Sequence, residues 1–239
     1  MKRLLGLALL LGLSATLSLS SSAAPTTDQK KAKEKLQEIQ EFIGLWNGNG
    51  GPPLPKKPAP GEIWKETINV GWKFKGDDAW LGLEFKNGRY FKTGDLRYLP
   101  AKDKFELTLV DKADKKLVFD GTYKNEKLAF ERVDPETKET QLLLLETLGE
   151  GVRLIYRYNT KPDGSTIVKK VFEVAAGRDG ESFAAAKEKK AVCVVSGGLG
   201  TMAVSHKGET FYVCCSGCAE AFKDNPEKYI AEFKAKMKK

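Results

Sequence analysis

Apolar residues recur at two different spacings along this chain, and the change of spacing divides it. Near the start, apolar positions lie three or four residues apart with Lys, Glu and Gln between them: Ala32, Leu36, Ile39, Phe42 and Ile43. This spacing is typical of one apolar helix face. Residues 28–45 are therefore predicted to form a helix, with Asp28 as its N-cap. A proline-rich stretch from Pro52 to Pro60 follows and predicts an extended loop.

From about residue 62 to residue 175, apolar and polar residues alternate, and turn residues recur about every 8–12 positions. Phe105, Leu107 and Leu109, for example, alternate with charged or hydroxyl side chains. Asn87-Gly88 lies between two such runs, residues 80–85 and Arg89-Tyr90-Phe91-Lys92, and predicts a type I′ hairpin turn between these two strands. The pattern predicts about nine or ten short antiparallel strands, which favours an up-and-down β-barrel, with a two-sheet sandwich as the alternative.

The first residues have the composition of a targeting segment. Lys2 and Arg3 precede an apolar run from Leu4 to Leu13, and Ser22-Ala23-Ala24 has the small residues of a cleavage site. This order is typical of a secretory signal peptide, with cleavage near Ala24, and a non-cleaved anchor is the alternative. No later stretch reaches 18 apolar residues, so we expect a secreted or periplasmic protein without a stable membrane span.

Composition narrows the function further. The 239 residues are 41% apolar and 30% charged, with a net charge of +8 and one histidine. These values indicate a folded chain and exclude a histidine-rich metal site. Basic and acidic residues are mixed except in the tail, where Lys234, Lys236, Lys238 and Lys239 are clustered. We therefore expect no specific nucleic-acid partner. No pairing of acidic residues indicates catalysis, so an enzyme is not expected.

The four cysteines all lie near the C-terminus, and their spacing is that of a metal site. They are Cys193, Cys214, Cys215 and Cys218. Residues 209–213 are predicted to form a strand and Cys218 to begin a helix, so two sulfurs four residues apart can meet one ion. Thiolates suit zinc or copper. Disulfides are the competing interpretation, because secreted cysteines usually pair, and a redox-switchable mixture is a third.

The stretch Cys193-Val-Val-Ser-Gly, the strand Phe211-Tyr212-Val213 with its cysteines, and the ending Asn225-Pro-Glu-Lys-Tyr resemble the YHS/TRASH family of small treble-clef-like metal-binding domains. The resemblance implies metal sensing, storage or delivery, with Cys193, Cys214 and Cys218 as ligands. Cys215 is then either a fourth ligand or a bystander. His206 is either a further ligand or a solvated turn residue.

The motif Gly44-x-Trp46-x-Gly48-x-Gly50 ahead of the strands resembles the calycin-like barrels, which include the lipocalins and nitrobindins. The resemblance implies a cavity for a small apolar ligand, and the alternative is a core filled by side chains. Nitrobindins bind haem through a late histidine that this barrel lacks, so haem is not expected; Tyr156 and Tyr158 are the remaining candidate haem ligands. On physical grounds alone, a Trp on the first strand can plug one barrel end.

The expected organisation is a signal peptide at 1–24, an N-terminal helix at 25–43, a β-barrel at 44–177, a linker at 178–190 and a metal-binding domain at 191–239. The expected function is binding of zinc or copper by the cysteine module outside the cytoplasm. The alternatives are a thiol-redox protein, or a structural protein whose cysteine module is a zinc- or disulfide-stabilised interaction domain.

Overall fold

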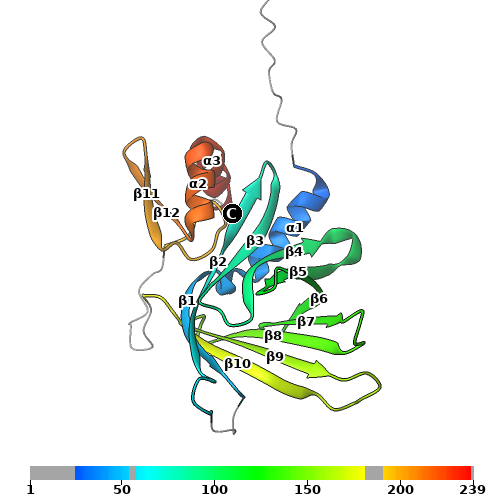
Figure 1. Ribbon diagram of the computed structural model, residues 1–239. Coiled ribbons are helices and arrows are strands. Elements are labelled where there is room, and N and C mark those ends of the chain that lie inside the picture. The colour runs from blue at the N-terminus through cyan, green and yellow to red at the C-terminus, as the bar shows by residue number, and fades with distance from the viewer. Residues whose placement is uncertain (1–24, 54–57, 181–190, 238–239) are drawn as a thin grey trace, which may run out of the picture.

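The computed structural model describes residues 25–53, 58–180 and 191–237. The predicted signal peptide at 1–24 and most of the predicted linker at 178–190 lie outside these residues. Figure 1 shows two parts, a large β-barrel and a smaller C-terminal module that packs beside it. Within the described ranges, no helix combines the length and apolar composition needed to cross a bilayer.

Ten antiparallel strands close into one barrel, in which each strand pairs with its neighbours in sequence and β1 pairs with β10. This confirms the predicted up-and-down barrel and excludes the sandwich. The strands are β1 (Gly44–Gly51), β2 (Trp64–Lys75), β3 (Asp78–Lys86), β4 (Phe91–Leu99), β5 (Lys104–Asp111), β6 (Lys116–Lys124), β7 (Lys127–Val133), β8 (Thr140–Leu148), β9 (Arg153–Lys161) and β10 (Lys169–Arg178). A short 3₁₀ turn, η2 (Pro100–Lys102), joins β4 to β5.

The apolar side chains that alternate along the predicted strands point inward and fill the barrel interior. Phe105, Leu107 and Leu109 of β5 are all buried, and their polar neighbours face outward. The same inward alternation on β2 buries Glu66, Ile68, Val70 and Trp72. Side chains with a period of two therefore form one continuous apolar core.

The N-terminal helix is shorter than predicted. Helix α1 (Thr27–Glu38) is followed by a 3₁₀ turn, η1 (Gln40–Phe42), and the chain enters β1 at Gly44. Thr26, not Asp28, caps the helix: its side chain accepts the backbone N–H of Gln29, whose side chain accepts that of Thr26. The apolar spacing continues through η1. The helix predicted from that spacing therefore ran to residue 45, beyond the end of α1 at Glu38.

The prediction of a type I′ turn at Asn87-Gly88 is wrong, because that turn needs a positive φ at both residues. Asn87 has a positive φ of 57° but Gly88 does not, and the connection runs from Lys86 to Phe91. Tyr90, predicted to lie in the strand, instead stacks on Phe172 with ring centroids 4.3 Å apart. The contact with a distant strand overrides the local turn preference.

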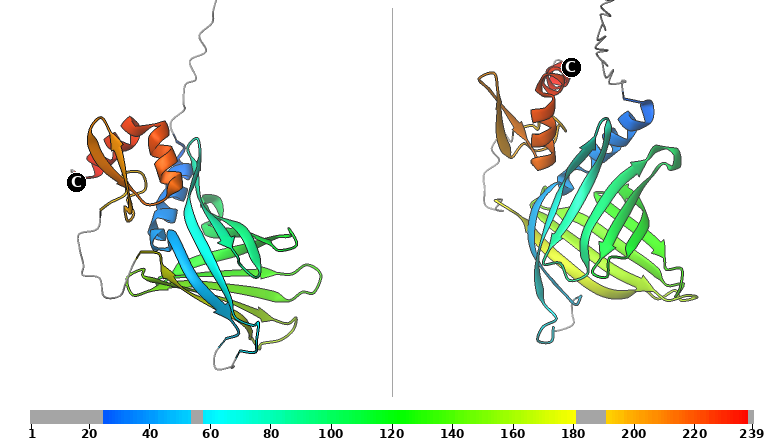
Figure 2. Two further views of the ribbon diagram at one scale, coloured as in Figure 1. Left: turned by 60° about the vertical axis from the view of Figure 1, so that its left-hand side comes forward. Right: turned by 45° about the horizontal axis from the view of Figure 1, so that its top comes forward.

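One end of the barrel is closed by α1, η1 and a tryptophan. Helix α1 packs against β3 and β4, as Figure 2 shows, and Trp46 is fully buried with its indole N–H donated to the carbonyl oxygen of Phe42 at 2.9 Å. Trp46 therefore plugs this end, as predicted from its place on the first strand. Arg178 lies over the Trp46 ring at 4.2 Å.

Arg178 joins three chain segments at this end. Its guanidinium donates to the carbonyl oxygens of Gly151, Ile43 and Glu41. A planar guanidinium can serve three acceptors while stacking on a ring, which a lysine cannot do. Residue 178 was predicted to lie in the linker, because no local sequence pattern distinguishes Arg178 from a solvated arginine.

We expect Arg178→Ala to lower the free energy of unfolding by about 2–4 kcal/mol, because three partly buried carbonyls lose a charged donor. Arg178→Lys should restore little of this loss. The matched control is Arg153→Ala on an exposed site of β9, which should change stability by no more than about 0.5 kcal/mol. Denaturant unfolding followed by circular dichroism gives the measurement; equal stability of the two alanine variants would contradict this role.

Candidate metal centre

The C-terminal module consists of residues 191–237. A two-stranded hairpin, β11 (Met202–His206) and β12 (Glu209–Val213), leads into α2 (Ser216–Asp224) and α3 (Pro226–Met237). The strand at 209–213 and the helix containing Cys218 are thus where the sequence predicted them. The Asn225 side chain accepts the backbone N–H of Lys228 at 3.3 Å, so Asn225-Pro226 begins α3 as expected.

Cys193 lies in a tight turn before the hairpin. The backbone N–H of Gly197 donates to the Cys193 carbonyl oxygen at 2.8 Å, and that of Cys193 donates to Gly198 at 2.7 Å. Gly197 has a φ of 79°, which favours glycine at this position. The turn also brings the Ser196 N–H to 3.4 Å from Cys193 Sγ. Cys193 is fully buried, and its backbone forms a bridge with Tyr212 of β12.

Cys214 and Cys218 come from the step between strand and helix. Cys214 directly follows β12, and Cys218 lies in the first turn of α2. The free backbone N–H groups and the dipole of a helix N-terminus favour negative charge there. Cys218 is fully buried, whereas Cys214 is half-buried.

Together these segments bring three sulfurs to one point. The Sγ atoms of Cys193, Cys214 and Cys218, called here the three-sulfur cluster, all lie within 4.8 Å of one another. Cys214 and Cys218 are 3.5 Å apart. A tetrahedral zinc with bonds of about 2.3 Å separates its sulfurs by about 3.8 Å. The spacing of the cluster therefore fits a metal ion bound by three thiolates.

The thiols of the three-sulfur cluster are hydrogen-bonded to one another. Contacts with Cys214 and Cys218 lower the pKa of Cys193, because both donate toward its sulfur. The contact with Cys193 in turn raises the pKa of Cys214 and of Cys218, since each stays protonated as a donor. A metal cation would replace these protons, because thiolates are the metal ligands.

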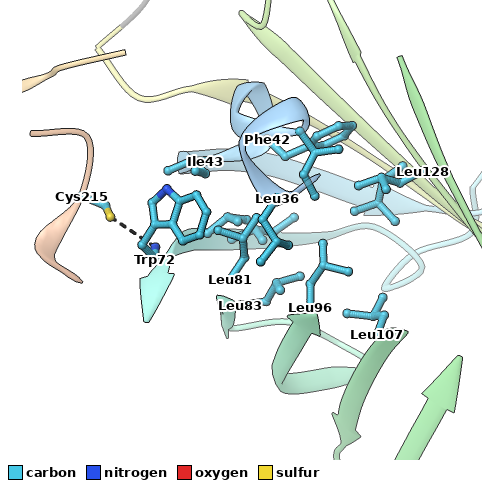
Figure 3. Close-up of a cluster of buried hydrophobic side chains, with 14 of the residues drawn as sticks. Leu36, Phe42, Ile43, Trp72, Leu81, Leu83, Leu96, Leu107, Leu128 and Cys215 are labelled. Atoms are coloured by element: carbon cyan, nitrogen blue, oxygen red, sulfur yellow. Dashed lines mark hydrogen bonds between the residues drawn. The ribbon is translucent and has the colours of Figure 1, made fainter. Parts of the chain in front are cut away.

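Cys215 and His206 lie outside the three-sulfur cluster. The Sγ of Cys215 lies 3.8 Å from Cys214 Sγ, also contacts the Cys218 thiol, and accepts the backbone N–H of Trp72, in β2, at 3.3 Å (Figure 3). His206 Nε2 lies 3.0 Å from a carboxylate oxygen of Glu227 at the start of α3. Glu227 also binds Lys207, so these contacts join the hairpin to α3.

Two neighbours of the cluster were not predicted from the sequence. Ser196 is 1% exposed, and its hydroxyl lies 3.4 Å from Cys214 Sγ. Trp72 contacts Cys215 of the module through its backbone N–H. The identity of its side chain therefore could not have predicted this contact. Ser196 could have been found from its place in the Cys193-Val-Val-Ser-Gly turn, where a hydroxyl faces the ligand segment.

The barrel interior is nearly filled. Its cavity has a volume of about 30 Å³ and is lined by apolar side chains and Tyr156, which is room for about one water molecule. Tyr156 donates to the buried carboxylate of Glu66 at 2.7 Å, and both Tyr156 and Tyr158 pack against Phe172. A small apolar ligand in the barrel stays a prediction.

The fold and the site define a closed antiparallel β-barrel protein with a cysteine cluster that can hold a metal ion. No family model matches the chain, and no curated protein matches it. Among solved structures, the chain is similar to one described as the crystal structure of Rv2717c from M. tuberculosis. The two share 16% identity, with a TM-score of 0.38, over 60% of this chain and 96% of that one.

Because Cys214 and Cys218 hold their protons more tightly than ordinary thiols, metal binding should release protons. Because the pKa of both thiols is raised, the apparent affinity for zinc is expected to increase as the pH is raised through neutrality. Competition with a chromophoric chelator at fixed ionic strength, corrected for the chelator's own protonation, measures this. An affinity that does not change with pH would contradict proton release by the thiols.

Proposed function

We propose that this chain is an exported metal-binding protein in which Cys193, Cys214 and Cys218 bind a thiophilic ion for sensing, storage or delivery. The observation that carries the proposal is the convergence of three sulfurs from two separate segments to within 4.8 Å. Buried cysteines scattered for packing have no reason to converge in this way. Soft thiolate ligands favour Zn(II) or Cu(I) over hard, oxygen-preferring ions.

The resemblance of this module to the YHS/TRASH family supports the same conclusion, and the composition of residues 1–24 supports export. Three protein ligands leave one position of a tetrahedral ion for water or an exchanging ligand, whereas structural zinc sites are usually closed by four. An open position suits an ion that is passed on more than one that only stabilises the fold.

In the bound state the ion would supply a soft Lewis acid at the start of α2. Cys193 and Cys218 would hold it from the buried side, and half-buried Cys214 from the side nearer solvent. The Ser196 hydroxyl, near Cys214 Sγ, would donate to that thiolate and keep it oriented.

Elemental analysis of exported, mature protein tests the proposal. Wild-type protein should carry about one equivalent of zinc or copper, as expected for a single thiolate site. Cys218→Ser should reduce the content to background, because it removes one of the two fully buried ligands. His206→Ala is the matched control and should keep the metal, since His206 contacts Glu227 outside the cluster.

Thiol counting separates metal binding from disulfide formation. Protein with no metal and no free thiols would contradict the proposal and indicate a disulfide-stabilised module.

Removal of the metal by a chelator separates an exchanging ion from a structural one. Metal that a chelator removes while the far-ultraviolet circular dichroism persists would favour exchange. Loss of the module's helical signal on chelation would favour a structural ion.

A further inference from the structure

The four sulfurs of the C-terminal module form two triangles that share one edge. The first triangle is the three-sulfur cluster of Cys193, Cys214 and Cys218. Cys215 lies outside that cluster, yet its Sγ is 3.8 Å from Cys214 Sγ and also contacts the Cys218 thiol. The sulfurs of Cys214 and Cys218, which are 3.5 Å apart, therefore belong to both triangles.

The edges that meet at Cys214 have the length found in a three-coordinate metal site. Sulfurs bound to one ion by bonds of about 2.3 Å, at angles of about 100–120°, lie about 3.5–4.0 Å apart. The distances from Cys214 Sγ to Cys218 Sγ, 3.5 Å, and to Cys215 Sγ, 3.8 Å, both fall in this range. The shared pair can therefore serve two ions, and each ion would complete its set with one unshared sulfur.

Each unshared sulfur accepts a backbone N–H from outside the two triangles. The Ser196 N–H lies 3.4 Å from Cys193 Sγ, and the Trp72 N–H lies 3.3 Å from Cys215 Sγ (Figure 3). Trp72 can donate because β2 continues beyond Val70, its last residue paired with β1. Such donors stabilise the charge of a thiolate and fix its direction. The barrel thus supports one end of the four-sulfur set, and the glycine turn supports the other.

The side of the site formed by Cys215 is shielded from solvent. Cys215 is 8% exposed, and both Trp72 and Cys218 are buried. A Cβ built on Gly217 would lie 1.7 Å from the Trp72 carbonyl oxygen, so α2 lies directly against β2. An ion on this side would be surrounded by sulfur and backbone rather than by water. This environment favours an ion that is satisfied by three soft ligands over zinc, which almost always takes four.

We infer that the module can bind two Cu(I) ions that share the thiolates of Cys214 and Cys218. Cys193 completes the first site and Cys215 completes the second, which fills when Cu(I) exceeds one equivalent. The inference rests on the metal binding proposed above and adds the number of ions and the preferred metal. Cu(I) is a soft ion that three thiolates satisfy, so neither ion needs an oxygen ligand. Each thiol gives its proton to solvent as it binds, and no electron is transferred.

Titration of reduced, metal-free mature protein with Cu(I) under nitrogen counts the ions, with a colorimetric Cu(I) chelator as competitor. Wild-type protein should take two equivalents, and Cys215→Ala should take one. Ser216→Ala changes the exposed residue next to Cys215; it is the matched control and should take two. Zinc should reach one equivalent in wild-type protein and in both variants, because the second site lacks a fourth ligand.

X-ray absorption at the copper edge shows whether the two ions share sulfurs. Ions that share sulfurs 3.5 Å apart through bonds of about 2.3 Å lie about 3 Å from each other. Wild-type protein with two equivalents should show three sulfurs and one copper neighbour around each copper. Cys215→Ala with one equivalent should show the sulfurs without the copper neighbour.

Circular dichroism checks the fold of each variant. If Cys215→Ala does not fold, Cys215→Ser takes its place, because its hydroxyl can still accept the Trp72 N–H but is a poor ligand for Cu(I). One equivalent of Cu(I) in wild-type protein, two in a folded Cys215 variant, or two ions without a copper neighbour would overturn the inference and leave the proposed function standing. Wild-type protein that binds neither zinc nor Cu(I) would instead overturn the proposed function.

Discussion

The mismatch in length between β1 and β2 is the constraint that joins the two parts of this molecule. A strand edge without a partner presents backbone donors and acceptors that must be paired or covered. Most barrels remove their edges by closing completely, and this one does so over most of its height. Beyond Val70 it does not, and the start of α2 supplies the missing acceptor as a thiol. The C-terminal module is therefore a structural continuation of the barrel wall.

The same contact explains why the cluster is well formed. Cys193 and Cys214–Cys218 come from segments that local backbone bonds hold in place, the glycine turn on one side and the strand-to-helix step on the other. Docking then fixes α2 relative to β2, and Gln37 of α1 fixes the turn through Ser196. Ligands held by packed secondary structure keep their geometry better than ligands on free loops.

Sequence reasoning succeeded where one physical signal dominates locally. The period of two along residues 62–175 predicts strands because each strand has one buried face, and the sequential hairpins then predict the barrel. The cysteine spacing similarly places Cys214 at a strand end and Cys218 in a helix, and the structure brings both to Cys193. These features depend on neighbours within a few residues or on one repeated pattern.

Three features that the sequence did not predict depend on contacts between distant segments, whereas the capping of α1 by Thr26 is a local contact with Gln29. Tyr90 leaves its predicted strand because it stacks on Phe172. Arg178 looks like a linker residue until Gly151, Ile43 and Glu41 are placed around it. The role of Cys215 depends on where β1 ends relative to β2, a register that no local pattern specifies. Its spacing left two readings open, ligand or bystander.

The two ends of the barrel show why the module sits where it does. At the end where aromatic rings cluster around Phe172, the backbone pairing of β1 with β2 extends to Trp64. At the other end, α1 covers the apolar interior and lies against β3 and β4, whereas α2 packs on β2. Cys215, the N-cap of α2, suits this position, because its sulfur accepts the strand N–H while the helix that follows supplies the nearby thiol of Cys218 to the three-sulfur cluster.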